Sequence, residues 1–185
     1  MDTREQIILA AIDEFGVKGL KFTMDDIARR LSISKKTIYT VFTSKEEILD
    51  GIADYGFARI KEAEEQIFNS DADIVDKIRN IIIAMPDSYR NLDFRKLEGL
   101  KEKFPNIYEK IQRNIETGWE NTMTLISQGV SEGRIRQVKL VILKEIISGT
   151  IEKFISSSEL KKADIEYNEA LENMMDIIMG GLIVR

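Results

Sequence analysis

The stretch that decides the fold comprises residues 23–49, TMDDIARRLSISKKTIYTVFTSKEEIL, and it predicts two short helices followed by the start of a third. Thr23 is a preferred N-cap residue, and Asp26 three positions later completes a capping-box pattern. Ser34 and Ser44 are the expected caps of the second and third helices. Apolar residues recur at helical spacing after each cap. The pattern therefore predicts a compact helix-turn-helix unit.

The second short helix places positive charge and hydroxyl groups together in a chain that is acidic as a whole. The formal net charge is −5, yet residues 27–45 contain five basic residues and no acidic one. A helix-turn-helix needs such donors to hold phosphates and to read base edges in a major groove. The residues that we expect to contact DNA are Thr23, Lys35, Lys36, Thr37, Tyr39, Thr40 and Lys45.

This stretch resembles the DNA-binding motif of TetR-family bacterial transcriptional regulators. The matching positions are Thr23, Ile27, Ala28, Ser34, Thr37, Ile38, Tyr39, Phe42, Ser44, Lys45 and Glu46, and upstream Ile8, Ala11, Phe15 and Gly19. Beyond the motif the resemblance rests on chain length, helical layout and two short matches at residues 104–105 and 132–135. One departure is Ser32, where the family usually has glycine. A left-handed turn at this position costs serine more than glycine.

The resemblance implies an all-α protein with an N-terminal three-helix helix-turn-helix domain and a larger C-terminal helical domain for ligand binding and dimerisation. We place the DNA-binding domain at residues 1–47 and the effector-binding and dimerisation domain at residues 48–185. The implied partners are a palindromic double-stranded DNA operator, a second copy of the chain and an unknown small-molecule effector. We therefore expect a sequence-specific transcriptional regulator that acts as a repressor and that the effector releases from its operator.

Aromatic and methionine residues of the C-terminal part are candidates for a cavity lining. Residues 107–130 carry apolar side chains at steps of four, which drift around a helix of 3.6 residues per turn. We expect this segment to form one central helix that is packed on several sides, where a bundle most easily leaves a cavity. The expected lining residues are Met85, Tyr89, Phe104, Tyr108, Ile115, Trp119 and Met123. The alternative is that these side chains only fill the core.

Two C-terminal helices, predicted over residues 138–157 and 165–183, carry apolar surfaces wider than one intramolecular face requires. Wide apolar surfaces of this kind are typical of subunit interfaces. The expected dimer interface residues are Ile147, Ile151, Phe154, Leu171, Met174, Met175, Ile178 and Leu182.

Composition restricts the other functional classes. The chain has no His and no Cys, so it lacks the commonest general base, the usual zinc ligands and any disulfide. A helical di-iron enzyme would need Glu-x-x-His motifs, and we expect no enzymatic activity, metal or cofactor. Apolar runs fall short of the roughly 20 residues of a membrane span, and we expect a cytoplasmic protein without membrane contact. A dimeric helical ligand-binding module without DNA-binding activity remains the alternative, against which the basic helix face argues.

Overall fold

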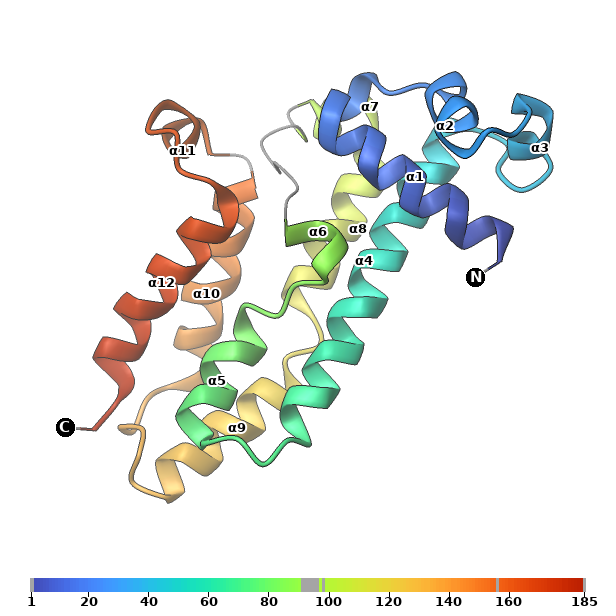
Figure 1. Cartoon of the computed structure of the whole chain (residues 1–185). Coiled ribbons are helices and arrows are strands. Elements are labelled where there is room, and N and C mark those ends of the chain that lie inside the picture. Colours follow the sequence, from blue (N-terminus) through green and yellow to red (C-terminus); the bar gives the residue numbers. More distant parts are fainter. Residues whose placement is uncertain (1, 91–96, 98, 156, 185) are drawn as a thin grey trace.

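The computed structural model describes residues 2–90, 97, 99–155 and 157–184 of the chain. Within these residues the structure is helical, with short connections and a single antiparallel bridge pair between Ile135 and Ile183. Figure 1 shows the first helices at one end of the long helix α4 (Lys45–Phe68), with the other helices mostly gathered on one side of it. The predicted all-α class, with a helix-turn-helix before a larger helical region, is confirmed.

The N-terminal unit consists of α1 (Thr3–Lys18), the 3₁₀ turn η1 (Gly19–Lys21), α2 (Met24–Leu31) and α3 (Lys35–Tyr39). The three predicted caps are confirmed, since the side chains of Thr23, Ser34 and Ser44 each accept a hydrogen bond from the backbone N–H three residues later. Phe22 and Phe42 are fully buried where the short helices meet. Helices as short as α2, with 8 residues, and α3, with 5, are marginally stable alone. Caps and shared burial therefore hold the unit together.

The long helix α4 connects this unit to the rest of the molecule. Its 24 residues correspond to a length of about 36 Å. Ile48 and Leu49 near its start are buried in the N-terminal core. The later turns pack against α5 (Ile74–Ile82), α8 (Pro105–Glu116) and α9 (Glu120–Ser131). The domain boundary placed after residue 47 falls inside the first turn of this continuous helix. The N-terminal unit and the C-terminal helices therefore share one continuous helix.

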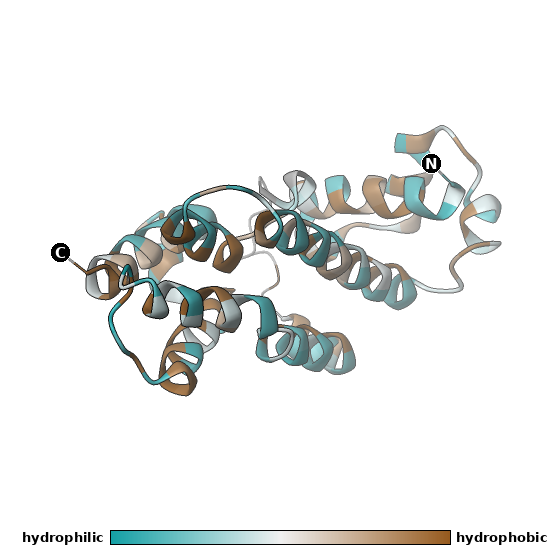
Figure 2. Cartoon of the chain, turned by 90° about the horizontal axis from the view of Figure 1, so that it is seen from below, coloured by the Kyte–Doolittle hydropathy of each residue, from teal (hydrophilic) through white to brown (hydrophobic). Residues whose placement is uncertain are grey.

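The C-terminal helices are α5 (Ile74–Ile82), α6 (Asp87–Arg90), α7 (Leu100–Lys103), α8 (Pro105–Glu116), α9 (Glu120–Ser131), α10 (Leu140–Ile155), α11 (Ser158–Lys162) and α12 (Tyr167–Leu182). A second core joins α5, α9, α10 and α12, and Ile78, Ile126, Ile147 and Met175 are fully buried in it. Figure 2 shows hydrophobic and hydrophilic residues alternating around the helices, as expected where one side of each helix is buried. None of the described helices is both long and apolar enough to cross a membrane.

The prediction of a single central helix over residues 107–130 is wrong, because the structure has two helices, α8 and α9, in its place. Gly118 separates them with a φ of +77°, a left-handed conformation from which an α-helix cannot continue. The freed carbonyl of Gly118 accepts a hydrogen bond from Lys61 Nζ at 2.6 Å. Trp119 Nε1 donates to the carbonyl of Ile115 at 2.8 Å, which links the residue after the break to the end of α8. The steps of four thus belong to two helices, each with its own buried side.

Candidate nucleic-acid interface and internal cavity

A left-handed turn at Ser32 sets the angle between α2 and α3. Ser32 has φ 54° and ψ 38°, the conformation that glycine adopts at least cost. The N–H of Ile33 donates to the carbonyl of Ala28 at 3.0 Å, which satisfies the end of α2. The fully buried side chains of Ile27 and Ile38 anchor the two helices to the core. The turn therefore leaves the opposite side of α3 facing outward.

The outer side of α3 brings together four of the residues predicted to contact DNA, namely Lys35, Lys36, Tyr39 and Thr40, all of which are exposed. Tyr39 is 47% exposed, although its neighbour Ile38 is fully buried. An exposed aromatic ring with a hydroxyl group, next to two ammonium groups, suits contact with a phosphate backbone.

The two lysines of this face differ in their surroundings. Lys35 Nζ lies 3.0 Å from a carboxylate oxygen of Asp25, and this carboxylate raises the pKa of Lys35. Lys36 forms no ion pair with any residue that the structure describes. Lys36 can therefore bind an anion directly, whereas Lys35 must first exchange its partner.

The other hydroxyl residues of the predicted site take part in local hydrogen bonds. The hydroxyl oxygens of Thr37 and Ser34 lie 2.8 Å apart, and Thr37 is half-buried. Thr40 Oγ1 donates to the carbonyl of Thr37 at 2.7 Å. Thr23 Oγ1 donates to Asp26 Oδ2 at 2.9 Å and accepts from the Asp26 N–H at 3.3 Å. Thr23, Ser34 and Thr37 hold the helix starts in position, whereas Thr40 is the C-cap of α3 and is exposed.

Lys45 lies in a different environment from the one predicted for it. Its ammonium donates to the carbonyl of Leu20 at 2.5 Å and stands 4.5 Å from the centre of the Phe22 ring. Burial lowers the pKa of Lys45, and the nearby Lys103 ammonium adds to this effect. The sequence predicts a phosphate contact because a lysine in a first turn opposes the helix dipole. The Leu20 carbonyl and the Phe22 ring are intramolecular partners of this ammonium, and the phosphate contact stays a prediction.

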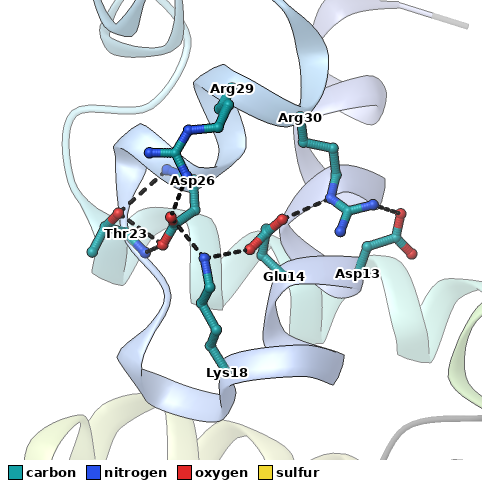
Figure 3. A network of polar contacts seen from close by, with 7 residues as sticks. All are labelled: Asp13, Glu14, Lys18, Thr23, Asp26, Arg29 and Arg30. Carbon is teal, nitrogen blue, oxygen red and sulfur yellow. Dashed lines mark hydrogen bonds and ion pairs between the residues drawn. The ribbon is translucent and has the colours of Figure 1, made fainter.

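A network of charged side chains, drawn in Figure 3, ties α1 to α2. Lys18 Nζ lies 3.0 Å from Glu14 and 2.7 Å from Asp26, while Arg30 lies 2.9 Å from Glu14 and 3.2 Å from Asp13. Hydrogen bonds from Lys18 and then Thr23 lower the pKa of Asp26 to about 2. The bond from Lys18 is also the largest cause that lowers the pKa of Glu14. No local spacing in the sequence predicts the bridge between Lys18 and Asp26, which depends on how α1 and α2 pack.

A cavity of about 190 Å³ lies beside α4 and is lined mainly by apolar side chains. Of the predicted lining residues, Met85, Tyr89, Ile115 and Trp119 line it. Tyr108 instead lines a neighbouring cavity of about 360 Å³, and Phe104 and Met123 line neither. Phe104 packs against the N-terminal core. The break at Gly118 explains why Met123 lines neither cavity, since the apolar side of α8 does not continue in register along α9.

The eight predicted interface residues lie mostly inside the single chain. Ile147, Leu171, Met174, Met175 and Leu182 are buried, and Ile151, Phe154 and Ile178 are half-buried. They pack α10 and α12 against the second core. The exposed apolar side chains of the same two helices are others, namely Val141, Ile142, Ile146 and Ile177. The prediction named the inward side, because both sides of these helices are apolar and periodicity does not tell them apart.

Comparisons with known proteins agree with this geometry. Residues 7–52 match the profile of the family described as "Bacterial regulatory proteins, tetR family". An uncharacterized HTH-type transcriptional regulator of Bacillus subtilis (strain 168), YvaF, is 24% identical over 89% of this chain and 87% of its own length. A second from the same organism, YhgD, is 29% identical over 90% of this chain and 76% of its own length.

A solved structure shows a similar fold over almost the whole chain. The crystal structure of the transcriptional regulator FadR from Bacillus subtilis in complex with stearoyl-CoA has a TM-score of 0.62 and 19% sequence identity. The similarity covers 96% of this chain and 98% of that one. The fold and the exposed α3 face define a helix-turn-helix DNA-binding protein. Residues 7–52 belong to the tetR family of bacterial regulatory proteins, and the chain is similar over most of its length to HTH-type transcriptional regulators.

Proposed function

We propose that the protein is a repressor that binds a palindromic operator as a homodimer, and that a small molecule bound in the cavity beside α4 releases it. The observation that carries the proposal is the outer side of α3, where two lysines, Tyr39 and Thr40 are exposed on a helix fixed to a buried core. In this proposal residues 1–47 contact DNA, and residues 48–185 bind the effector and the second copy.

The exposed sides of α10 and α12 support dimerisation. Ile146 is 52% exposed and Ile177 is 77% exposed. Gly149 and Gly180 lie on the same exposed sides, and a Cβ added at either would meet no atom within 4 Å. Glycine inside a helix costs about 1 kcal/mol relative to alanine, which close approach of a second copy would offset. A dimer would place two α3 helices about 34–36 Å apart, one turn of DNA.

Tyr89 supports a link between the cavity and the DNA-binding unit. Its ring lines the cavity and lies against Gly56 of α4, where an added Cβ would come within 2.9 Å of the ring. Its hydroxyl donates to the carbonyl of Ile52 at 2.6 Å, also on α4. A molecule that displaces this ring would shift α4 and, through it, the N-terminal unit. Coupling is reciprocal, so DNA must weaken the effector by the factor by which the effector weakens DNA.

The apolar lining favours an effector with a long apolar part. The lining residues run along α4 from Leu49 to Glu64, a distance of about 22 Å at ~1.5 Å per residue. The similar FadR structure contains stearoyl-CoA, whose acyl chain is a long apolar group. The ligand-binding module without DNA-binding activity is the competing function.

A salt titration on duplex DNA separates these two functions. The wild-type protein should bind DNA selected from random duplexes, and log affinity should fall linearly with log salt concentration. The Lys35→Ala/Lys36→Ala variant should bind more weakly and with a smaller slope, because it neutralises fewer phosphates. Unchanged affinity and slope in this variant would remove α3 as the DNA-contacting helix. Absence of binding by the wild-type protein would favour the competing function.

A further inference from the structure

The two cavities share a wall and differ in character. Leu97, Leu100, Ile111, Ile115 and Ile155 line both of them. The cavity beside α4 is mainly apolar, whereas the second one, between α7, α8, α10 and α11, is more polar. The two spaces therefore lie side by side as an apolar compartment and a polar one. Such a pair matches a ligand with an apolar chain and a polar head.

Glu152 of α10 is a half-buried carboxylate in the polar compartment. Its Oε1 accepts hydrogen bonds from Gln112 Nε2 and, at 3.4 Å, from Tyr108 Oη. Both neutral donors approach the same oxygen, and Oε2 has no partner among the residues that the structure describes. Burial and the Glu152 carboxylate raise the pKa of Tyr108, so its hydroxyl stays protonated as a donor. One carboxylate oxygen is thus left for a donor that the described part of the chain does not supply.

Two lysines also line the polar compartment. Lys101 and Lys161 are exposed, and Lys101 Nζ stands 5.5 Å from the centre of the Tyr108 ring. Among the described residues, Lys101 forms no ion pair with Glu152. Water and salt screen exposed charges strongly and half-buried charges much less. Of the charged residues that line this compartment, Lys101, Glu102 and Lys161 are exposed and Glu152 is half-buried, so the Glu152 carboxylate is the least screened charge.

We propose that the two compartments form one binding site for an amphipathic effector, whose unbranched apolar chain lies along α4 and whose hydrogen-bond-donating, cationic head binds Glu152 Oε2. The proposal rests on the function proposed above, because it names the chemical class of the effector. A primary alkylamine is the simplest molecule of this class. A carboxylate head on the same chain would meet a like charge at Glu152 and bind more weakly.

Isothermal titration calorimetry without DNA tests the head group, with dodecylamine, dodecanol and dodecanoate below their aggregation concentrations. The three probes share one chain length and differ only in the head. Dodecylamine should bind the wild-type protein most tightly and dodecanoate most weakly. Octylamine should bind more weakly than dodecylamine, since each buried methylene raises affinity about fourfold.

Two matched variants locate the head. Glu152→Gln keeps the shape but removes the charge, and it should lower the affinity for dodecylamine about tenfold or more, the effect of losing a hydrogen bond to a charged group. Glu145→Gln makes the same change at an exposed site on α10 and should leave the affinity unchanged. Failure of dodecylamine to bind, tighter binding of dodecanoate, or unchanged binding by Glu152→Gln would each overturn the proposal.

DNA release is measured separately, by fluorescence anisotropy of a labelled duplex. If dodecylamine binds through Glu152 but releases no DNA, the proposed effector-release function fails while the site stands. If DNA binding is intact and the alkylamines do not bind, the proposed site fails while the repressor function stands.

Discussion

The N-terminal helix-turn-helix unit and the C-terminal bundle solve different physical problems. The N-terminal unit holds helices of 8 and 5 residues, α2 and α3, by side-chain caps, a left-handed turn and a network of ion pairs. Its functional side chains lie on the outside. The C-terminal bundle holds longer helices by apolar contact, and it leaves a cavity among them. A rigid surface suits reading of DNA, whereas an interior with space suits a ligand that changes the packing.

The largest expected effect is on folding of the N-terminal unit. Phe42→Ala removes a fully buried ring from the core shared by the short helices, and it should lower the free energy of unfolding by about 3–5 kcal/mol. Trp119→Ala removes a half-buried ring from a cavity wall and should cost less. Urea denaturation followed by circular dichroism measures both. Equal losses would contradict the difference in packing between the two regions.

The next effect concerns the outer side of α3. Lys36→Ala should weaken operator binding by about 1–3 kcal/mol if the ammonium contacts a base. If it contacts a phosphate, it should weaken all sequences alike and lower the salt slope by about one. Lys21→Ala, at an exposed lysine of the same unit outside α3, is the control and should leave binding unchanged. Circular dichroism should show the same helical content for both variants.

A smaller effect is expected at Trp119, the only tryptophan of the chain. A molecule that releases the protein from DNA should change Trp119 emission over the same concentration range. Trp119→Ala should lower effector affinity more than DNA affinity, and Trp119→Phe should keep the fold and much of the effector affinity. A releasing ligand that leaves emission unchanged and binds Trp119→Ala as tightly as the wild type would locate the effector site elsewhere.

The smallest effect is a loss of stability in acid that depends on the network between α1 and α2. The folded-state pKa of Asp26 is about 2, and that of Glu14 is also lowered, with Lys18 as the main cause of both. Because these pKa values are lower in the folded than in the unfolded chain, the stabilisation is present above about pH 4 and is lost as the pH falls toward 2. Lys18→Met should reduce this pH dependence, which urea denaturation at several pH values measures. An unchanged profile would mean that the network does not contribute to stability.

The same comparison explains how far the sequence was informative. Thr23, Ser34 and Ser44 act on neighbouring backbone groups, so their caps could be predicted from local spacing. The partners of Lys45, Leu20 and Phe22, are distant in sequence and bring no recognisable pattern. The ion pair of Lys18 with Glu14 has the (i, i+4) spacing of a helix surface, but its bridge to Asp26 depends on how two helices pack.

The C-terminal bundle was predictable as a set of helices but not in its orientations. α10 carries apolar residues on two sides, with Ile147 buried and Ile146 exposed, and sequence periodicity does not say which side meets the core. Gly118 interrupts the segment between Ile107 and Val130 through one left-handed residue, which the surrounding apolar spacing conceals. The lining of a cavity depends on these rotations and breaks, which periodicity does not give. Only four of the seven predicted lining residues therefore line the cavity beside α4.

Selection of bound sequences from random duplexes by the wild-type protein tests the central claim most directly. A dimer that presents two copies of the exposed α3 face should enrich a palindrome whose half-site centres lie about 10–10.5 base pairs, or a multiple of that spacing, apart. The same selection with the Lys35→Ala/Lys36→Ala variant should lose this enrichment. Recovery of unrelated sequences by the wild-type protein, or of the same palindrome by the variant, would contradict the account.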